Sequence, residues 1–109
     1  MKSLNGETVR LSQYAGKKVI LNFWATWCTQ CKAEMPHLQS FYERYKDQGV
    51  EIVAVNVTDQ DKGKNAVAKI AEEYGLSFDI LLDEEGYAGM NYQIISLPTS
   101  FFIDEEGQI

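Results

Sequence analysis

The fold is decided by the stretch Trp24-Ala25-Thr26-Trp27-Cys28-Thr29-Gln30-Cys31-Lys32-Ala33-Glu34-Met35-Pro36, which holds both cysteines and both tryptophans of the chain. The apolar run over residues 19–24 leads into this stretch and predicts a buried strand. A pattern with the period of a helix follows it. A Cys-x-x-Cys pair at a strand-to-helix junction is typical of a dithiol that forms and breaks a disulfide. The sequence therefore predicts a redox site at this junction.

The composition of the 109 residues is that of a single globular domain, with 45% hydrophobic and 24% charged residues. The formal net charge of −6 argues against a nucleic acid or an anionic membrane surface as partner. No run approaches the roughly 20 apolar residues of a spanning helix, and no signal peptide opens the chain. Mature secreted domains share these properties, so the composition leaves the compartment open.

Apolar periodicity predicts strands that alternate with helices. Residues 1–18 are expected to form a hairpin, with a turn at Asn5-Gly6 and a short edge strand over residues 8–11. The later elements expected in chain order are a strand over 19–24, a helix ending at Gly49, a strand over 51–57, a helix over 66–74, a strand over 78–83, a short helix over 87–93 and a strand over 100–103. Strand, helix and strand joined by such a crossover imply parallel pairing, so the fold class is α/β.

The two cysteines are expected to serve chemistry, because a loop closed by cysteines three residues apart removes little chain entropy. Cys28 is expected at the helix N-terminus, where the helix dipole favours a thiolate and lowers the thiol pKa below its free value of about 8.5. Cys31 lies almost one turn further on and can resolve a mixed disulfide. Two other interpretations stay open: half of a zinc site, for which His37 lies on a different helix face, or a pair of incidental buried thiols.

Glu34 and the two tryptophans each have two interpretations. Glu34 is three residues after Cys31, so its carboxylate can either relay a proton to the inner thiol or be a solvated acid of the first helical turn. Trp24 is expected in the core and Trp27 beside the exposed sulfur, although both could be ordinary core aromatics.

The motif Phe23-Trp24-Ala25-Thr26-Trp27-Cys28-x-x-Cys31-Lys32-x-Glu34-x-Pro36, with Leu97-Pro98-Thr99 far downstream, resembles the TlpA/ResA-like thiol-disulfide oxidoreductases of the thioredoxin superfamily. The resemblance runs along essentially the whole chain. It implies a single thioredoxin-like domain over residues 1–109, with a central mixed sheet, an N-terminal hairpin and an inserted αβ segment over roughly residues 64–82.

The resemblance also implies roles for individual residues. Cys28 is the nucleophile and Cys31 the resolving cysteine. Pro98 follows a cis peptide bond and packs against the disulfide, while the backbone of its neighbours Leu97 and Thr99 pairs with an extended substrate segment.

Two further residues gain a role from the same resemblance. Trp27 lies on the substrate-binding surface, and Glu34 matches the active-site glutamate of the family. Ordinary thioredoxins carry a buried aspartate at the position of Asn22, and because asparagine takes up no proton, Glu34 becomes the expected proton carrier.

The chain departs from the family pattern in two ways. The dipeptide Thr29-Gln30 lacks the proline of many relatives, which leaves the redox potential open between about −270 mV in reducing members and about −120 mV in oxidising ones. The return strand, final helix and N-terminal anchor or signal of the family are absent, so the chain is expected to be trimmed at both ends. Its uncovered apolar face would then be exposed, or covered by a partner in a dimer or a domain swap.

The expected function is that of a bacterial extracytoplasmic thiol-disulfide oxidoreductase, which reduces disulfides of specific proteins, as in cytochrome c maturation, and takes electrons from an upstream thiol donor. Its redox centre is the Cys28–Cys31 pair, with no separate cofactor and no metal. The alternatives are a general cytoplasmic thioredoxin and a redox-sensing binding module without turnover.

Overall fold

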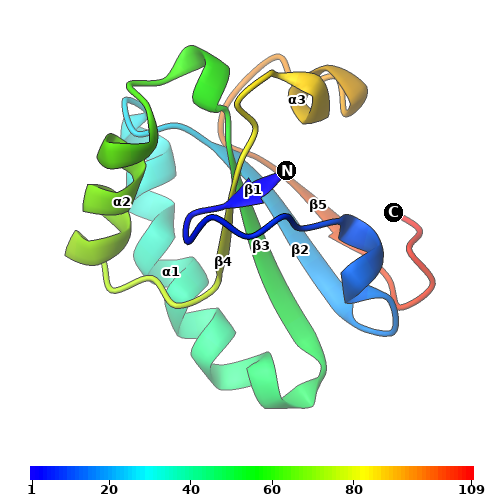
Figure 1. Cartoon of the computed structure of the whole chain (residues 1–109). Coiled ribbons are helices and arrows are strands. Elements are labelled where there is room, and N and C mark those ends of the chain that lie inside the picture. The colour runs from blue at the N-terminus through cyan, green and yellow to red at the C-terminus, as the bar shows by residue number, and fades with distance from the viewer.

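The computed structural model describes all residues 1–109 and contains a sheet of five strands (Figure 1). The strands are β1 Lys2–Ser3, β2 Lys18–Trp24, β3 Val50–Asn56, β4 Asp79–Leu82 and β5 Thr99–Ile103. The α-helices are α1 Thr29–Tyr45, α2 Lys64–Glu73 and α3 Tyr87–Asn91. Short 3-10 helices are η1 Leu11–Tyr14, η2 Lys46–Gln48 and η3 Thr58–Gln60. These bounds confirm the predicted order of elements after residue 18, to within a few residues.

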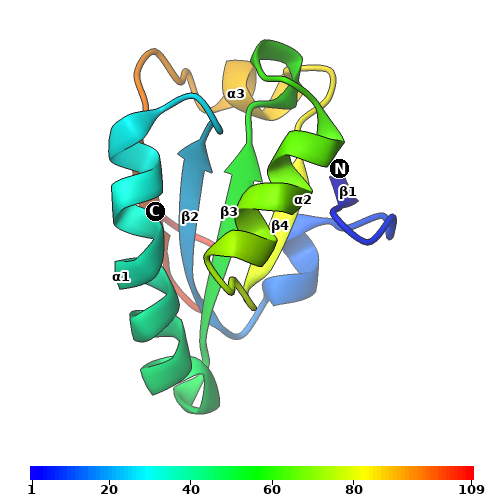
Figure 2. The ribbon, with the colours of Figure 1, turned by 90° about the vertical axis from the view of Figure 1, so that its left-hand side faces the viewer.

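The sheet is mixed and has the order β1-β4-β3-β2-β5. The three inner strands β4, β3 and β2 are parallel, and the two edge strands β1 and β5 are antiparallel to their neighbours. Helices α1 and α2 cover one face, as Figure 2 shows, while η1 lies on the other (Figure 1). No helix is long and apolar enough to cross a membrane. The predicted α/β class and mixed sheet are confirmed.

The core lies between the inner strands and these covering segments. Helices and loops cover both faces of β3, so apolar side chains are buried on both faces of this strand. The fully buried residues of β3 include Ile52, Val53, Ala54 and Val55. Helix α1 continues into η2, and Gly49 ends this helical segment with a left-handed φ of 80°, as predicted. The carboxyl ends of β2, β3 and β4 lie at one edge of the sheet, which is where parallel α/β sheets place their sites.

The predicted edge strand over residues 8–11 is wrong. Only an isolated bridge joins Thr8 to Lys2, and the chain turns into η1 because the N–H of Gln13 donates to the carbonyl of Arg10. The predicted hairpin around Asn5-Gly6 is confirmed, because the N–H of Ser3 donates to the carbonyl of Glu7 at 2.7 Å, and β1 enters the sheet by pairing with β4.

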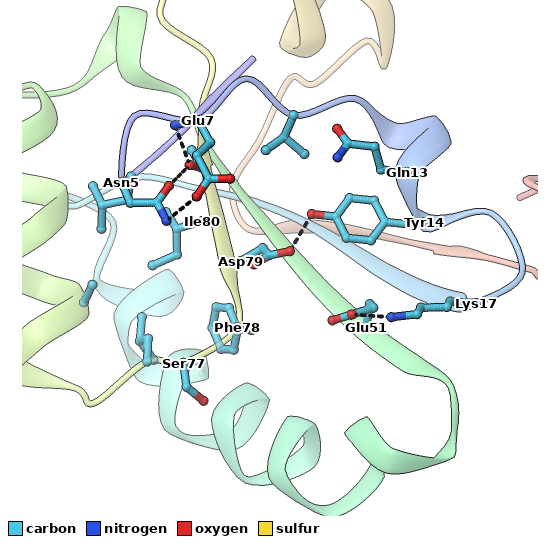
Figure 3. A pocket seen from close by; sticks show the side chains of 15 residues that line it. Asn5, Glu7, Gln13, Tyr14, Lys17, Glu51, Ser77, Phe78, Asp79 and Ile80 are labelled. Carbon is cyan, nitrogen blue, oxygen red and sulfur yellow. Dashed lines mark hydrogen bonds and ion pairs between the residues drawn. The ribbon is translucent and has the colours of Figure 1, made fainter.

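The N-terminal segment packs over a cavity of about 540 Å³ at the amino ends of β3 and β4 (Figure 3). The hydroxyl of Tyr14 donates to Asp79 at 2.6 Å, and Lys17 pairs with Glu51 at 2.9 Å. These contacts fasten the segment to the sheet. They lie at the opposite edge from the cysteine motif, because Cys28 follows the carboxyl end of β2.

An apolar face beside β5 is exposed, as expected. Phe102 on β5 is 71% exposed, and Phe41 of α1 and Ile109 are exposed with it. These three residues line a depression of about 390 Å³ together with Ile20, the register partner of Phe102.

Candidate active site

Cys28 forms the N-terminal cap of α1. Its backbone is extended, and its Sγ accepts the backbone N–H of Cys31 at 3.2 Å. This N–H lies in the first turn of the helix, where N–H groups have no acceptor within the helix itself. The same N–H and the helix dipole favour a thiolate at this position. The sequence predicted this placement at the helix N-terminus, and the structure confirms it.

Cys28 and Cys31 are joined by a disulfide, with a Cα–Cα separation of 5.2 Å. The two cysteines differ in exposure, because Cys28 is 8% exposed and Cys31 is fully buried. A sulfur of an incoming substrate can therefore reach Cys28 first. This difference agrees with the predicted roles of nucleophile and resolving cysteine.

The peptide bond between Leu97 and Pro98 is cis, as the resemblance implied. It lies directly before β5, where Thr99 pairs with Phe23 near the carboxyl end of β2. The register of β5 thus brings the Leu97-Pro98-Thr99 segment to the edge of the sheet that carries the cysteines.

Glu34 faces the sheet rather than open solvent. Its Oε1 accepts a hydrogen bond of 3.0 Å from Nδ2 of the fully buried Asn22. The same Nδ2 donates to Ser100 Oγ on β5 at 2.9 Å, a contact that the sequence did not predict. The half-buried position favours the functional interpretation of Glu34 over that of a solvated acid, and its role as a proton carrier stays a prediction.

Sequence reasoning missed Asp61, which organises the loop before Cys28. Its carboxylate accepts the backbone N–H of Thr26 at 2.7 Å, the hydroxyl of Thr26, Asn56 Nδ2 at 2.9 Å and the N–H of Lys62 at 2.7 Å. Partial burial raises the pKa of this carboxyl, but the hydrogen bonds from Thr26, Asn56 and Lys62 outweigh burial and hold the pKa below its ordinary value. Local sequence patterns carry no signal for a bond between residues this far apart.

The two tryptophans lie where they were expected. Trp24 is fully buried, and Trp27 is 52% exposed directly before Cys28. The indole N–H of Trp27 donates to the backbone carbonyl of Gln60 at 2.9 Å, which fixes the ring against the loop after β3.

A groove of about 310 Å³ extends from the cysteine motif along the carboxyl edge of the sheet. We call it the Trp27–Met90 groove. It is lined by Trp27, Val57, Asp59, Gln60, Gly86, Gly89, Met90, Ile94, Ile95, Ser96 and Leu97. Three of these residues are large, apolar and exposed: Trp27, Met90 and Ile95.

Helix α3, which supplies Met90, is held at this edge by Asp83. The buried carboxylate of Asp83 accepts the N–H groups of Ala88 and Gly89 at 3.1 and 2.8 Å. Gly86 allows the close approach of η3, since its φ is 76° and a Cβ there would lie 2.6 Å from Asp59 Oδ2.

A mixed sheet with a helix-capping Cys-x-x-Cys disulfide and a cis-proline loop beside it defines a thioredoxin-fold protein. The chain belongs to the AhpC/TSA family, whose model matches residues 1–109, and it resembles the ResA thiol-disulfide oxidoreductases.

The comparisons with individual proteins agree. The chain is 46% identical over 109 residues to the thiol-disulfide oxidoreductase ResA of Geobacillus kaustophilus, and 42% identical to the thioredoxin-like protein YneN of Bacillus subtilis. These matches cover all of the chain but only 61% and 63% of the two relatives.

Solved structures give the same result. StoA from Bacillus subtilis superposes with a TM-score of 0.86 at 38% identity, over 100% of this chain and 81% of that one. A secreted Mycobacterium tuberculosis disulfide oxidoreductase homologous to E. coli DsbE superposes with a TM-score of 0.87 at 25% identity, over 98% of this chain and 76% of that one.

Proposed function

We propose that the chain exchanges disulfides with protein substrates through Cys28 and Cys31. The observation that carries this proposal is the position of Cys28 Sγ, which caps α1 on the accessible side of a disulfide whose other sulfur is buried. An anion-stabilising helix end and an accessible sulfur are what a nucleophilic thiolate requires. The dithiol form of the cysteine pair carries the two electrons and becomes the disulfide when it gives them up, so the proposed reaction needs no separate cofactor and no metal.

The reaction has two steps. The thiolate of Cys28 attacks one sulfur of the substrate disulfide, forms a mixed disulfide and releases the other substrate sulfur as a thiol once it takes up a proton. Cys31 then attacks Cys28 Sγ, which forms the Cys28–Cys31 bond and releases the second substrate thiol. An upstream thiol donor must afterwards reduce the disulfide for another turnover.

The substrate is a protein segment held beside the disulfide. Leu97 and Thr99 flank Pro98 with backbone groups for an extended chain, and the Trp27–Met90 groove continues from them with exposed apolar side chains. Leu97 belongs to both parts of this surface.

We place this activity outside the cytoplasm and in the reducing direction, as a cytochrome c maturation reductant would be. The similarity to a secreted disulfide oxidoreductase supports the compartment. A redox titration of the Cys28–Cys31 couple tests the direction. A reduction potential of about −270 mV, like that of thioredoxin, supports a reductant, and a potential of about −120 mV makes the protein an oxidant.

Turnover of insulin disulfides with dithiothreitol as the donor tests the proposal. The wild-type chain should accelerate precipitation of the insulin B chain, and Cys28→Ser should abolish that acceleration. Cys31→Ser should instead accumulate a mixed disulfide with the substrate through Cys28, detectable by mass spectrometry. A wild-type chain without turnover would indicate a redox-sensing binding module and reject the enzyme.

A further inference from the structure

The amide of Asn22 connects a carboxylate on α1 with a hydroxyl on β5. Asn22 is fully buried and pairs in register with Ser100 across β2 and β5. Its Nδ2 donates to Glu34 Oε1 at 3.0 Å and to Ser100 Oγ at 2.9 Å. Because an amide nitrogen carries two hydrogens, both are used in these two bonds. The amide therefore fixes Glu34 relative to the edge strand.

The partners of the amide determine its orientation. An ionised carboxylate can only accept, so the atom that faces Glu34 must be Nδ2. Asn22 Oδ1 then points into the interior without a hydrogen-bond partner. Loss of the Ser100 acceptor would leave a buried N–H unpaired as well, and the present orientation would lose one of its two bonds.

We propose that Ser100 is a positioning residue for Glu34 and acts through the amide of Asn22. Glu34 lies one helical turn after Cys31, the thiol that must give up its proton before it can resolve a mixed disulfide. The hydroxyl of Ser100 keeps the amide in the orientation that holds Glu34 Oε1 beside the sheet. This inference rests on the proposed function, because the position of the carboxylate matters only if Cys31 reacts.

The Cys31 thiol transfers its proton to the Glu34 carboxylate, and the resulting thiolate attacks Cys28 Sγ of the mixed disulfide. The Cys28–Cys31 bond forms as the bond from Cys28 to the substrate sulfur breaks. The substrate sulfur leaves with that electron pair and takes up a proton from the Glu34 carboxyl group or from water, so the dithiol has reduced the substrate disulfide by two electrons.

A matched pair of variants separates the hydroxyl from the shape of the side chain. Ser100→Thr keeps the hydroxyl and Ser100→Val replaces it with a methyl group, while both are β-branched and suit a strand. Each is combined with Cys28→Ser, which leaves Cys31 as the one thiol. The ultraviolet absorbance of the Cys31 thiolate is then followed as a function of pH. Because Ser100 is solvent-exposed, the larger side chains of both variants have room at this position. Ser100→Ala removes the hydroxyl without adding a branch and so repeats the test.

The Cys31 titration should distinguish the two variants. In Ser100→Val we expect the ratio of thiolate to thiol at a fixed pH near the midpoint to change about threefold, in the direction in which Glu34→Gln changes it. Ser100→Thr should follow the Cys28→Ser parent. When Glu34→Gln is already present, Ser100→Val should cause no further change, because there is no carboxylate left to hold.

Three results would overturn the inference. They are equal titrations for Ser100→Val and Ser100→Thr, an effect of Ser100→Val that persists beside Glu34→Gln, and a Glu34→Gln variant that titrates like its parent. A merely structural role would lower the unfolding free energy of Ser100→Val without such dependence on Glu34. The titration needs no turnover, so a failure of this inference would show in the titration alone. A failure of the proposed function would show instead as absent insulin reduction by the wild type.

Discussion

The backbone N–H of Thr26 donates to the carboxylate of Asp61 at 2.7 Å, and this bond ties the loop before Cys28 to the loop after β3. Asn56, which is fully buried, donates to the same carboxylate. In Asp61→Ala both donors lose their acceptor, so we expect the free energy of unfolding to fall by about 2–3 kcal/mol. Urea denaturation measures this loss.

Asp59 provides the control for that variant, since it lies two residues before Asp61 and its carboxylate makes no hydrogen bond or ion pair. Asp59→Ala should change the free energy of unfolding by less than about 0.5 kcal/mol. Equal losses for the two alanine variants would show that the bonds to Asp61 are not what stabilises this loop.

The stabilisation by Asp61 should depend on pH. Its pKa in the folded chain is held below the unfolded value of about 3.9, so folding favours the ionised form. The stabilisation by the ionised Asp61 carboxylate is complete above the pKa of the unfolded chain. It is lost as pH falls through the lower pKa of the folded chain. The stability difference between wild type and Asp61→Asn should therefore be constant near neutral pH and shrink at pH values below about 4. Urea titrations at several pH values measure it, and a difference that grows in acid would contradict the assignment.

The Trp27–Met90 groove should matter for protein substrates alone. Met90 is 73% exposed within it, so a bound apolar side chain would gain contact that Met90→Ser removes. We expect the KM for a protein disulfide to rise about three- to tenfold, which corresponds to about 1 kcal/mol of lost apolar contact, while turnover of oxidised glutathione stays unchanged. Tyr87→Ser is the control, because Tyr87 is exposed on the same helix and lies outside the groove. Equal effects of the two variants would argue against this binding surface.

Tyr14 should contribute to stability without affecting the redox site. Burial and the hydrogen bond to Asp79 raise the pKa of the Tyr14 phenol, so folding favours its neutral form. Tyr14→Phe should lower the free energy of unfolding by about 1 kcal/mol, a difference present below the unfolded pKa of about 10 and lost as pH rises above it. The potential of the Cys28–Cys31 couple should not change, and a shifted potential would mean that the two sheet edges communicate.

The exposed apolar face should make the chain associate. Phe102 and Ile20 are register partners on this face, and an apolar patch of this kind is costly in water. We expect sedimentation equilibrium to detect oligomers of residues 1–109 that Phe102→Lys dissociates and Tyr87→Lys does not. A wild-type chain that stays monomeric at every concentration would reject association through Phe102.

The sequence predicts most of the elements and the centre of the site, because both depend on local signals. Periodic apolar residues define the helices, Gly49 marks the end of a helical segment, and Cys28 lies at a strand-to-helix junction that is visible in the motif. The cis bond before Pro98 came from the family resemblance rather than from any local pattern.

The unpredicted part consists of contacts between distant segments. Asp61 bonds to Thr26 and Ser100 to Asn22 across separations of 35 and 78 residues, and no periodicity reveals which carboxylate or hydroxyl fills such a place. The edge strand expected over residues 8–11 failed for a related reason. The hairpin turn at Asn5-Gly6 does pair Lys2 with Thr8, but the pairing stops at this bridge, and the long-range partner of β1 is β4.

The register of β5 has a consequence for the order in which a growing chain acquires its parts. Both cysteines leave the ribosome well before Pro98, which directly precedes β5, and Ser100, which belongs to β5. A nascent chain can therefore carry both thiols while Asn22 still lacks its hydroxyl partner 78 residues away. The exchange-competent arrangement is complete only when β5 docks on β2, so the catalytic surface matures later in synthesis than its two sulfurs.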